Sequence, residues 1–266
     1  MNMDAVTIVA IILGSVIPTL LYLVWMWRAD RKDGQRFRTI AAAFAAGATI
    51  SVVTGVILSA LILAAIVVLY VISTGDLSVA DISLTTGWLA FITAVFVAPF
   101  AEELCKGGSV LLFRRRMDSL ETGIIIGASV GLGFAAVENI LYGATAAEEG
   151  LEFALLLIGL RSVTAALGHA GYTAITGYGI AKWNRSRRPK LIWIPFYLVA
   201  VLLHAFSNLL ASISEVMVVG EWFQIACVAI LLVMDVSIIL LLRRRIKQLD
   251  SPAASSPAAQ PPLQSF

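Results

Sequence analysis

About seven runs of roughly 20 mostly apolar residues divide this 266-residue chain, and each is long enough to cross the hydrocarbon core of a bilayer as a helix. In lipid, a helix satisfies all of its backbone hydrogen bonds within one segment. We therefore predict an all-α, polytopic membrane bundle of about seven transmembrane helices. They lie near residues 5–27, 44–71, 88–113, 122–142, 153–181, 191–213 and 222–242.

The composition agrees with a membrane protein. Only 14% of the residues are charged and 59% are hydrophobic, whereas about 25% charged residues is typical of soluble domains. The net charge of +2 comes from basic clusters at segment ends, so nucleic acid is not an expected partner. The first run follows Asp4 and ends without a small-residue cleavage site, so we expect it to stay as a membrane anchor. We assign no role to Cys105 or Cys227.

Basic residues follow alternate predicted helices. They include Arg28 to Arg38, Arg114 to Arg116, Lys182 to Lys190 and Arg243 to Lys247. By the positive-inside rule these ends face the cytoplasm, which predicts an N-out, C-in topology. We take residues 1–248 as one transmembrane domain with its motifs in 88–212, and residues 249–266, rich in Pro, Ala and Ser, as a disordered cytoplasmic tail.

The third predicted helix carries three charged residues, Glu102, Glu103 and Lys106. A charge at the bilayer centre costs roughly 2.5 to 3.5 kcal/mol, so these groups must be paired, hydrated or functional. Lys106 is four residues from one glutamate and three from the other, so it can hold both. Adjacent residues point about 100° apart on a helix, so the sequence does not decide which glutamate faces a site. Pro99 lacks an N–H and is expected to kink the helix or leave a carbonyl open.

Three other predicted helices carry polar groups at a similar depth. Glu138 lies in the fourth, His169 in the fifth, and His204 with Asn208 one turn later in the sixth; the chain has no other histidine. At about 1.5 Å per residue, these groups and the glutamates of the third helix lie roughly 16 to 26 Å from the predicted cytoplasmic ends. Four helices therefore contribute to one polar layer.

Two further features accompany the polar layer. Gly123, Gly127 and Gly131 recur at four-residue spacing and predict a groove for a neighbouring helix. The same stripe continues to Glu138, so this carboxylate is expected on or beside a packed face. We interpret Arg161 as an interfacial anchor or a partner for Glu138.

The polar layer is suited to hydrolysis. Two imidazoles and a carboxylate can bind a zinc-like ion with an open water position, while a second carboxylate acts as general base. For this Zn²⁺ set we consider His169, His204 and Glu103. Without metal, a glutamate and one histidine activate water directly, while the other histidine and Asn208 donate hydrogen bonds to the oxyanion of a peptide carbonyl. The residues leave this choice open.

Two other functions use the same residues. Glu/His relays near the midplane also serve proton- or ion-coupled transporters, although we see no inverted repeat of broken helices. A non-catalytic membrane scaffold would retain the polar layer for packing alone. The transporter is the main alternative to a hydrolase.

Four motifs in order resemble the PrsW family of intramembrane proteases, which is similar to the CAAX prenyl protease and bacteriocin-processing clan. They are Glu102-Glu-x-x-Lys106, Phe134-x-x-x-Glu138 followed by Asn139, His169 followed by Thr173 and Gly177, and His204-x-x-x-Asn208. The resemblance covers about residues 88–212. It implies a membrane-embedded endopeptidase with an active centre drawn from Glu102, Glu103, Glu138, His169, His204 and Asn208, supported by Lys106 and Asn139.

The resemblance also implies a location and a kind of partner. Family members are multi-pass proteins of the bacterial plasma membrane, and their substrates are membrane-anchored proteins. A member makes the first cut in an anti-sigma factor during envelope-stress signalling, so such a protein is one candidate substrate. The clan's second motif often ends in His, where this chain has Glu138. The oligomeric state is not implied.

Overall fold

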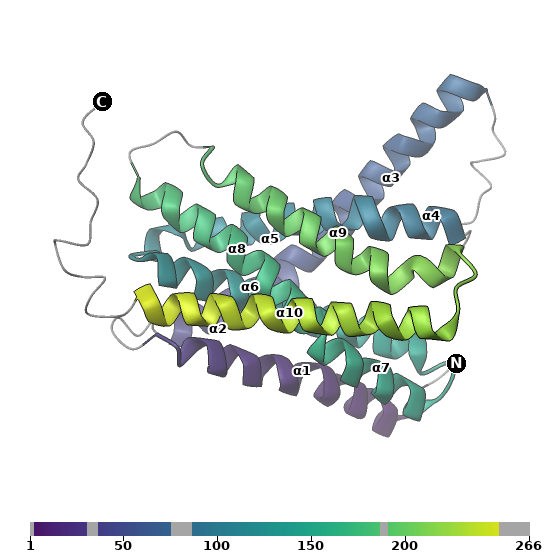
Figure 1. Cartoon of the computed structure of the whole chain (residues 1–266), viewed down its shortest axis with the longest axis horizontal. Helices are drawn as coiled ribbons and strands as arrows, with labels where there is room; N and C mark the ends of the chain where they lie inside the picture. The colour runs from purple at the N-terminus through teal and green to yellow at the C-terminus, as the bar shows by residue number, and fades with distance from the viewer. Residues whose placement is uncertain (1–2, 31–36, 76–86, 187–190, 250–266) are drawn as a thin grey trace.

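The computed structural model describes residues 3–30, 37–75, 87–186 and 191–249, and every regular element in these ranges is helical (Figure 1). The α-helices are α1 (Ala5–Trp27), α2 (Phe37–Ala46), α3 (Val52–Thr74), α4 (Gly87–Ile92), α5 (Ala98–Leu112), α6 (Leu120–Ala146), α7 (Leu151–Val163), α8 (Ala165–Arg185), α9 (Ile194–Val216) and α10 (Glu221–Leu249). The π-helical turns η1 (Gly47–Ser51) and η3 (Thr93–Val97) and the 3₁₀ turn η4 (Arg114–Arg116) join some of them. The predicted all-α fold is confirmed. From residue 250 on, the predicted tail lies outside the described residues.

Six helical segments in the described ranges, some of them made of two consecutive elements, are long and apolar enough to cross a membrane. They are Ala5–Trp27, Phe37–Thr74, Leu120–Ala146, Leu151–Arg185, Ile194–Ser214 and Glu221–Leu249. Each coincides with a predicted span. The remaining predicted span, 88–113, corresponds to the helical segment α4–η3–α5, which differs from the others because its last part carries two glutamates and a lysine. The orientation, N-out and C-in, stays a prediction.

Helix α6 lies at the centre of the bundle, in contact with α1, α2, α7 and α8. In an apolar 18-residue stretch of α6 78% of the residues are buried, against 6% in such a stretch of the helix formed by α2, η1 and α3. A Cβ atom on Gly127 would overlap the carbonyl oxygen of Thr173, and one on Gly131 would overlap that of His169. The backbones of α6 and α8 are therefore in direct contact, which confirms the predicted glycine groove.

The predicted cytoplasmic ends meet at one end of the bundle, on the left in Figure 1. Arg243 donates from Nε to the carbonyl of Trp25, 3.4 Å away, and Asn184 donates from Nδ2 to the carbonyl of Arg114 at 3.3 Å. These contacts join α10 to α1 and the end of α8 to η4. The described parts of the segments that carry the basic clusters therefore share one side of the bundle.

The helical segment before Pro99 widens into the π-helical turn η3. In this register the carbonyl of Ala94 faces residue 99, whose ring nitrogen carries no hydrogen. That carbonyl accepts a hydrogen bond from Nδ2 of Asn208 instead, at 2.7 Å. In a regular α-helix the carbonyl left open by Pro99 would be that of Val95. The π-helical register shifts it to Ala94, whose contact with Asn208 connects the α5 segment to α9.

The fifth predicted span, 153–181, is two helices rather than one. α7 ends and α8 begins around Thr164, whose backbone leaves the helical region at φ −98° and ψ −80°. Its hydroxyl donates to the carbonyl of Leu160 at 3.0 Å, a side-chain contact that competes with helical hydrogen bonds and bends helices.

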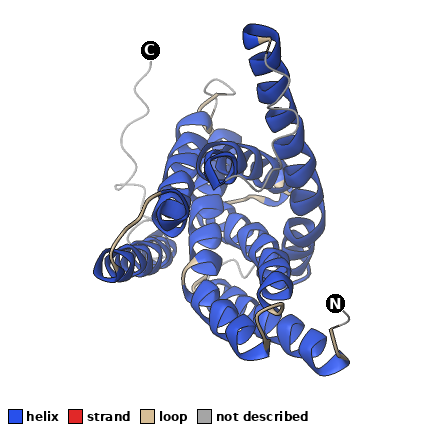
Figure 2. Ribbon diagram, turned by 90° about the vertical axis from the view of Figure 1, so that its right-hand side faces the viewer, coloured by secondary structure: helices blue, strands red, loops and turns tan. Residues whose placement is uncertain are grey.

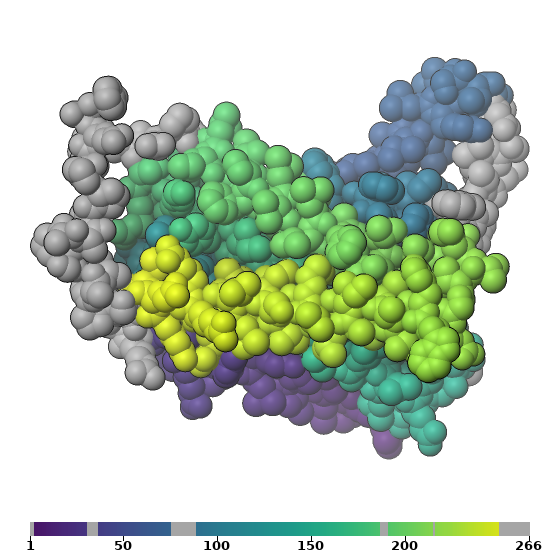
Figure 3. Space-filling model, viewed as in Figure 1, coloured from purple at the N-terminus to yellow at the C-terminus, as the bar shows by residue number. Residues whose placement is uncertain are grey.

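Helix α3 projects away from the bundle, as the two perpendicular ribbon views show (Figures 1 and 2). Of this fully described helix only Gly55 is buried, next to Glu102 and Phe134. The space-filling view shows an open notch between α3 and the body of the bundle (Figure 3). The exposed side chains of α3 are apolar along most of its length, as suits contact with lipid.

Candidate active site

Lys106 is the charged centre of the polar layer. Its side chain is fully buried, and its Nζ lies 2.6 Å from Oε1 of Glu103 and 3.6 Å from Oε2 of Glu102. The ammonium group also lies 4.4 Å from the centre of the Phe134 ring, within the range of a cation–π contact. Lys106 therefore compensates both carboxylates, the role that the four-residue and three-residue spacings predicted.

Glu103 is fully buried and is held from three helices. Besides Lys106 on its own helix, it contacts Nδ1 of His204 at 3.1 Å and accepts from the hydroxyl of Thr173 at 3.3 Å. A carboxylate on one imidazole nitrogen sets the ring's tautomer and direction. Glu103 thus orients the ring of His204, and Nε2 of that ring points away from Glu103.

His169 lies between Lys106 and Glu138. Its Nδ1 is 2.9 Å from Nζ of Lys106, and its Nε2 is 2.8 Å from Oε2 of Glu138. An ammonium group can only donate, so Nδ1 is the acceptor and the hydrogen of a neutral ring lies on Nε2, where it is donated to Glu138. The contact between α6 and α8 at Gly131 sets the register that makes this pairing possible.

Arg161 completes the surroundings of Glu138. It donates from Nη2 to Oε2 of Glu138 at 2.7 Å and from Nε to Oδ1 of Asn139 at 3.0 Å, and its guanidinium lies 3.6 Å from the centre of the Tyr142 ring. Of the two interpretations of Arg161, the partner for Glu138 agrees with these contacts. Asn139 is buried beside it, as a supporting residue would be.

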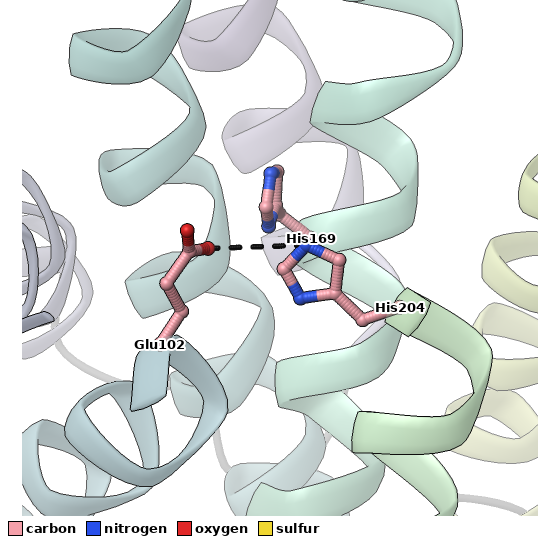
Figure 4. Close-up of side chains that lie close together, drawn as sticks. All are labelled: Glu102, His169 and His204. Atoms are coloured by element: carbon pink, nitrogen blue, oxygen red, sulfur yellow. Dashed lines mark ion pairs between the residues drawn. The ribbon is translucent and has the colours of Figure 1, made fainter. Parts of the chain in front are cut away.

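Glu102 has a carboxylate oxygen that forms no hydrogen bond. Its Oε2 is buried without a hydrogen-bond partner, and it lies 3.8 Å from Nε2 of His204 (Figure 4). Ligand atoms of Glu102, His169 and His204 all lie within 4.8 Å of one another. The structure therefore groups Glu102 with the two histidines, whereas we had considered Glu103 for the third ligand.

This donor set fits a zinc-like ion, provided that His169 gives up one of its two present contacts. Two imidazoles and a carboxylate are usual zinc ligands, and the contact of Glu103 with Nδ1 of His204 is the support that ligating histidines normally have. Both nitrogens of His169 are engaged, so a metal on this ring has to replace its contact with Lys106 or with Glu138. The free oxygen of Glu102 needs no such exchange.

A cavity of about 360 Å³ opens beside these groups. Its walls come from α6, α7, α8, α9 and α10, and they include Glu138, Arg161, His169, His204, Asn208 and Asp235. Apolar residues such as Leu157, Leu160 and Leu231 line the cavity together with these polar groups. An extended segment of another polypeptide could therefore meet both histidines and Glu138 inside the bundle.

The structure brings the predicted residues of all four helices together, and it adds some that we missed. Tyr172 and Ser207 lie in the predicted helices 153–181 and 191–213, and Asp235 in 222–242, but none belongs to a motif. A lone acidic residue in an apolar run was a signal for Asp235, because intramembrane charge is rare without a function. No comparable signal marks Tyr172 or Ser207.

Comparison with known proteins agrees with this geometry. A model of the family described as "PrsW family intramembrane metalloprotease" matches residues 35–240 of the chain. The chain is also similar to two curated proteins named Protease PrsW. That of Oceanobacillus iheyensis is 36% identical over 124 residues, 44% of this chain and 54% of the relative, and that of Halalkalibacterium halodurans is 39% identical over 98 residues, 36% and 40% of the two chains.

The chain spans about half the length of the curated relatives it matches. No solved structure matches it.

Proposed function

Because this chain belongs to the PrsW family of intramembrane metalloproteases, we propose that it is an intramembrane endopeptidase that hydrolyses a peptide bond of a membrane-anchored protein. The observation that carries the proposal is the grouping of Glu102 with His169 and His204, beside a cavity that the two histidines and Glu138 line. Buried carboxylates and imidazoles are costly in a membrane, and here they surround a space that a peptide could enter.

In the metal-free form of this proposal Glu102 is the general base. Its free Oε2 accepts a proton from a water molecule as the water oxygen attacks the peptide carbonyl carbon. The proton then passes to the nitrogen of the leaving chain as the C–N bond breaks. Glu103 and Lys106 remain paired, keep His204 oriented, and supply the charge balance that Glu102 needs.

Asn208 and, when both of its ring nitrogens carry a proton, His204 face the developing negative charge on the carbonyl oxygen. The amide of Asn208 is fixed because one Nδ2 hydrogen is donated to the carbonyl of Ala94, which leaves the second hydrogen for an oxyanion. Glu138, held by Arg161 and His169, lines the same cavity. Fixed donors in a site shielded from water are the main source of transition-state stabilisation in acyl transfer.

A divalent metal, when bound, would be held by Glu102, His169 and His204, and it would supply Lewis-acid polarisation of the carbonyl and a more acidic bound water.

We expect purified protein to hold about one zinc per chain and the His169→Ala/His204→Ala variant to hold none, measured by elemental analysis of folded protein. Glu102→Gln should weaken zinc binding more than Glu103→Gln. The reverse order would favour the ligand set with Glu103, and an active preparation without metal would favour direct activation of water by glutamate.

We propose a single-span protein of the bacterial plasma membrane as the substrate, with an anti-sigma factor as one candidate. A substrate segment has to leave its helical form to offer a peptide bond, because helical carbonyls are already hydrogen-bonded. The family match does not favour the transporter alternative.

The proposed activity can be tested with membranes from a strain in which the gene for this enzyme has been deleted. Wild-type protein is reconstituted with these membranes, and newly formed protein N-termini are identified by mass spectrometry. We expect new N-termini within or next to single transmembrane spans, absent when the enzyme carries His204→Ala. The same N-termini with both enzymes would contradict the proposal, and proton or ion flux in proteoliposomes without cleavage would indicate the transporter.

A further inference from the structure

The last helix contributes a buried carboxylate that belongs to none of the four motifs. Asp235 of α10 has no exposed surface, and its neighbours in sequence from residue 225 to 242 are otherwise almost entirely apolar. An acidic side chain at this depth is expensive unless it is held by partners or serves a function. The contacts of Asp235 lead from α10 to the polar layer.

The first of these contacts is with Tyr172 of α8. The phenol hydroxyl of Tyr172 donates to Oδ1 of Asp235, and it also lies 2.5 Å from the hydroxyl oxygen of Ser207. Gly168 leaves the space for this arrangement, because a Cβ atom there would lie 2.8 Å from the phenol oxygen and 3.1 Å from Oδ1 of Asp235. The hydroxyl of Tyr172 is therefore held by two helices, α9 and α10.

The second contact joins Tyr172 to the proposed active site. Its ring stacks on the imidazole of His204, with the ring centres 5.6 Å apart and the planes inclined by 26°. The torsion that rotates an imidazole about its Cβ–Cγ bond is broad, so backbone position alone does not set the plane of the ring. Glu103 holds one nitrogen of His204, and the face of Tyr172 prevents the ring from turning about that contact.

We propose that Asp235 is a positioning residue for the hydrolytic site. Through the hydroxyl of Tyr172 it holds the plane of the His204 ring, so that Nδ1 meets Glu103 while Nε2 faces Glu102 and the cavity. The proposal rests on the proposed function, in which His204 takes part in the hydrolysis, and it adds the residues that orient the His204 ring. Its first test does not depend on cleavage.

The first test uses the two histidines of the chain, whose ring nitrogens can be labelled selectively with ¹⁵N. A His169→Gln variant assigns the signals of His204. We expect Asp235→Ala and Tyr172→Phe to shift or broaden the His204 ring signals, because the ring samples more than one plane. The matched control is Ile239→Ala. Ile239 lies one turn further along α10 and is also buried, but its hydrophobic cluster does not include Tyr172. This control should leave the His204 signals unchanged. Unchanged His204 signals in Asp235→Ala would overturn the proposal, whether or not the protein cleaves anything.

The second test uses a substrate found by the mass-spectrometry experiment described above. It is the single-span protein that the wild-type enzyme cleaves most strongly. We expect Asp235→Ala to lower kcat about 10- to 100-fold with KM changed less than about twofold, because a misplaced catalytic group affects the reaction step. Asp235→Asn keeps an acceptor for the Tyr172 hydroxyl and should restore most of kcat. In a Tyr172→Phe background Asp235→Ala should have little further effect. Independent effects of the two substitutions, or an equal loss in folded Ile239→Ala, would show a packing role and contradict the proposal.

Discussion

Replacing Glu102 by glutamine is expected to lower cleavage by about 10²- to 10⁴-fold, the range usual for loss of a general base. The physical reason is the free Oε2 of this residue, which faces His204 but forms no hydrogen bond. Glutamine has nearly the same shape, yet it cannot accept the proton of water. Since the side chain is 14% exposed and its oxygen lies 3.6 Å from Lys106, against 2.6 Å for Glu103, the variant should unfold closer to the wild-type temperature than Glu103→Gln.

The matched control is Glu103→Gln on the adjacent position. Glu103 is fully buried and contacts Lys106, His204 and Thr173, so its charge is part of the packing of three helices. This variant should lose both stability and activity. Cleavage rates and thermal unfolding of the two proteins in the same detergent separate the roles. If Glu103→Gln is inactive but fully stable while Glu102→Gln stays active, the two assignments must be exchanged.

Replacing Lys106 by methionine is expected to lower the free energy of unfolding by about 3 to 5 kcal/mol, the usual cost of removing one partner of a buried ion pair. Methionine has a similar length and fills the space beside Phe134, but it leaves Glu103 without its 2.6 Å partner. His169 also loses the donor at Nδ1, so activity should fall together with stability. Unfolding by increasing denaturant in mixed micelles measures the change.

A double variant distinguishes loss of charge balance from loss of packing. In Lys106→Met/Glu103→Gln both members of the closest pair are neutral, and replacing a whole buried pair is often nearly neutral for stability. We therefore expect the double variant to recover much of the stability that Lys106→Met loses, although not its activity. A double variant as unstable as the single one would show that the lysine acts through packing. A fully stable single variant would contradict the ion-pair interpretation itself.

Much of the fold follows from local properties of the chain. An apolar run near 20 residues long has to become a helix in lipid, and for this reason the predicted span limits fall within a few residues of most observed helices. The break at Thr164 was not predicted, because an apolar run continues through it and hydropathy does not report backbone direction. Pro99 could be read locally, but the partner of the carbonyl that it leaves open, Asn208, lies on a different helix.

The members of the polar layer were predictable from the sequence, but their geometry was not. Charged and imidazole groups inside apolar segments are conspicuous because burying them is costly, so Glu102, Glu103, Glu138, His169 and His204 could be named from the sequence alone. Asp235 could have been named for the same reason. Tyr172 could not, because an aromatic residue in a membrane helix is ordinary until its neighbours are known.

The sequence by itself determined that this chain forms membrane helices carrying a polar layer, because apolar length and intramembrane charge are properties of single segments. Only the tertiary structure decided which glutamate has the free oxygen, which nitrogen of each histidine meets which carboxylate, and that α10 reaches His204 through Tyr172. These contacts depend on the rotation and register of each helix against its neighbours. Those in turn are set by close backbone packing, such as that of α6 on α8, between segments far apart in the chain.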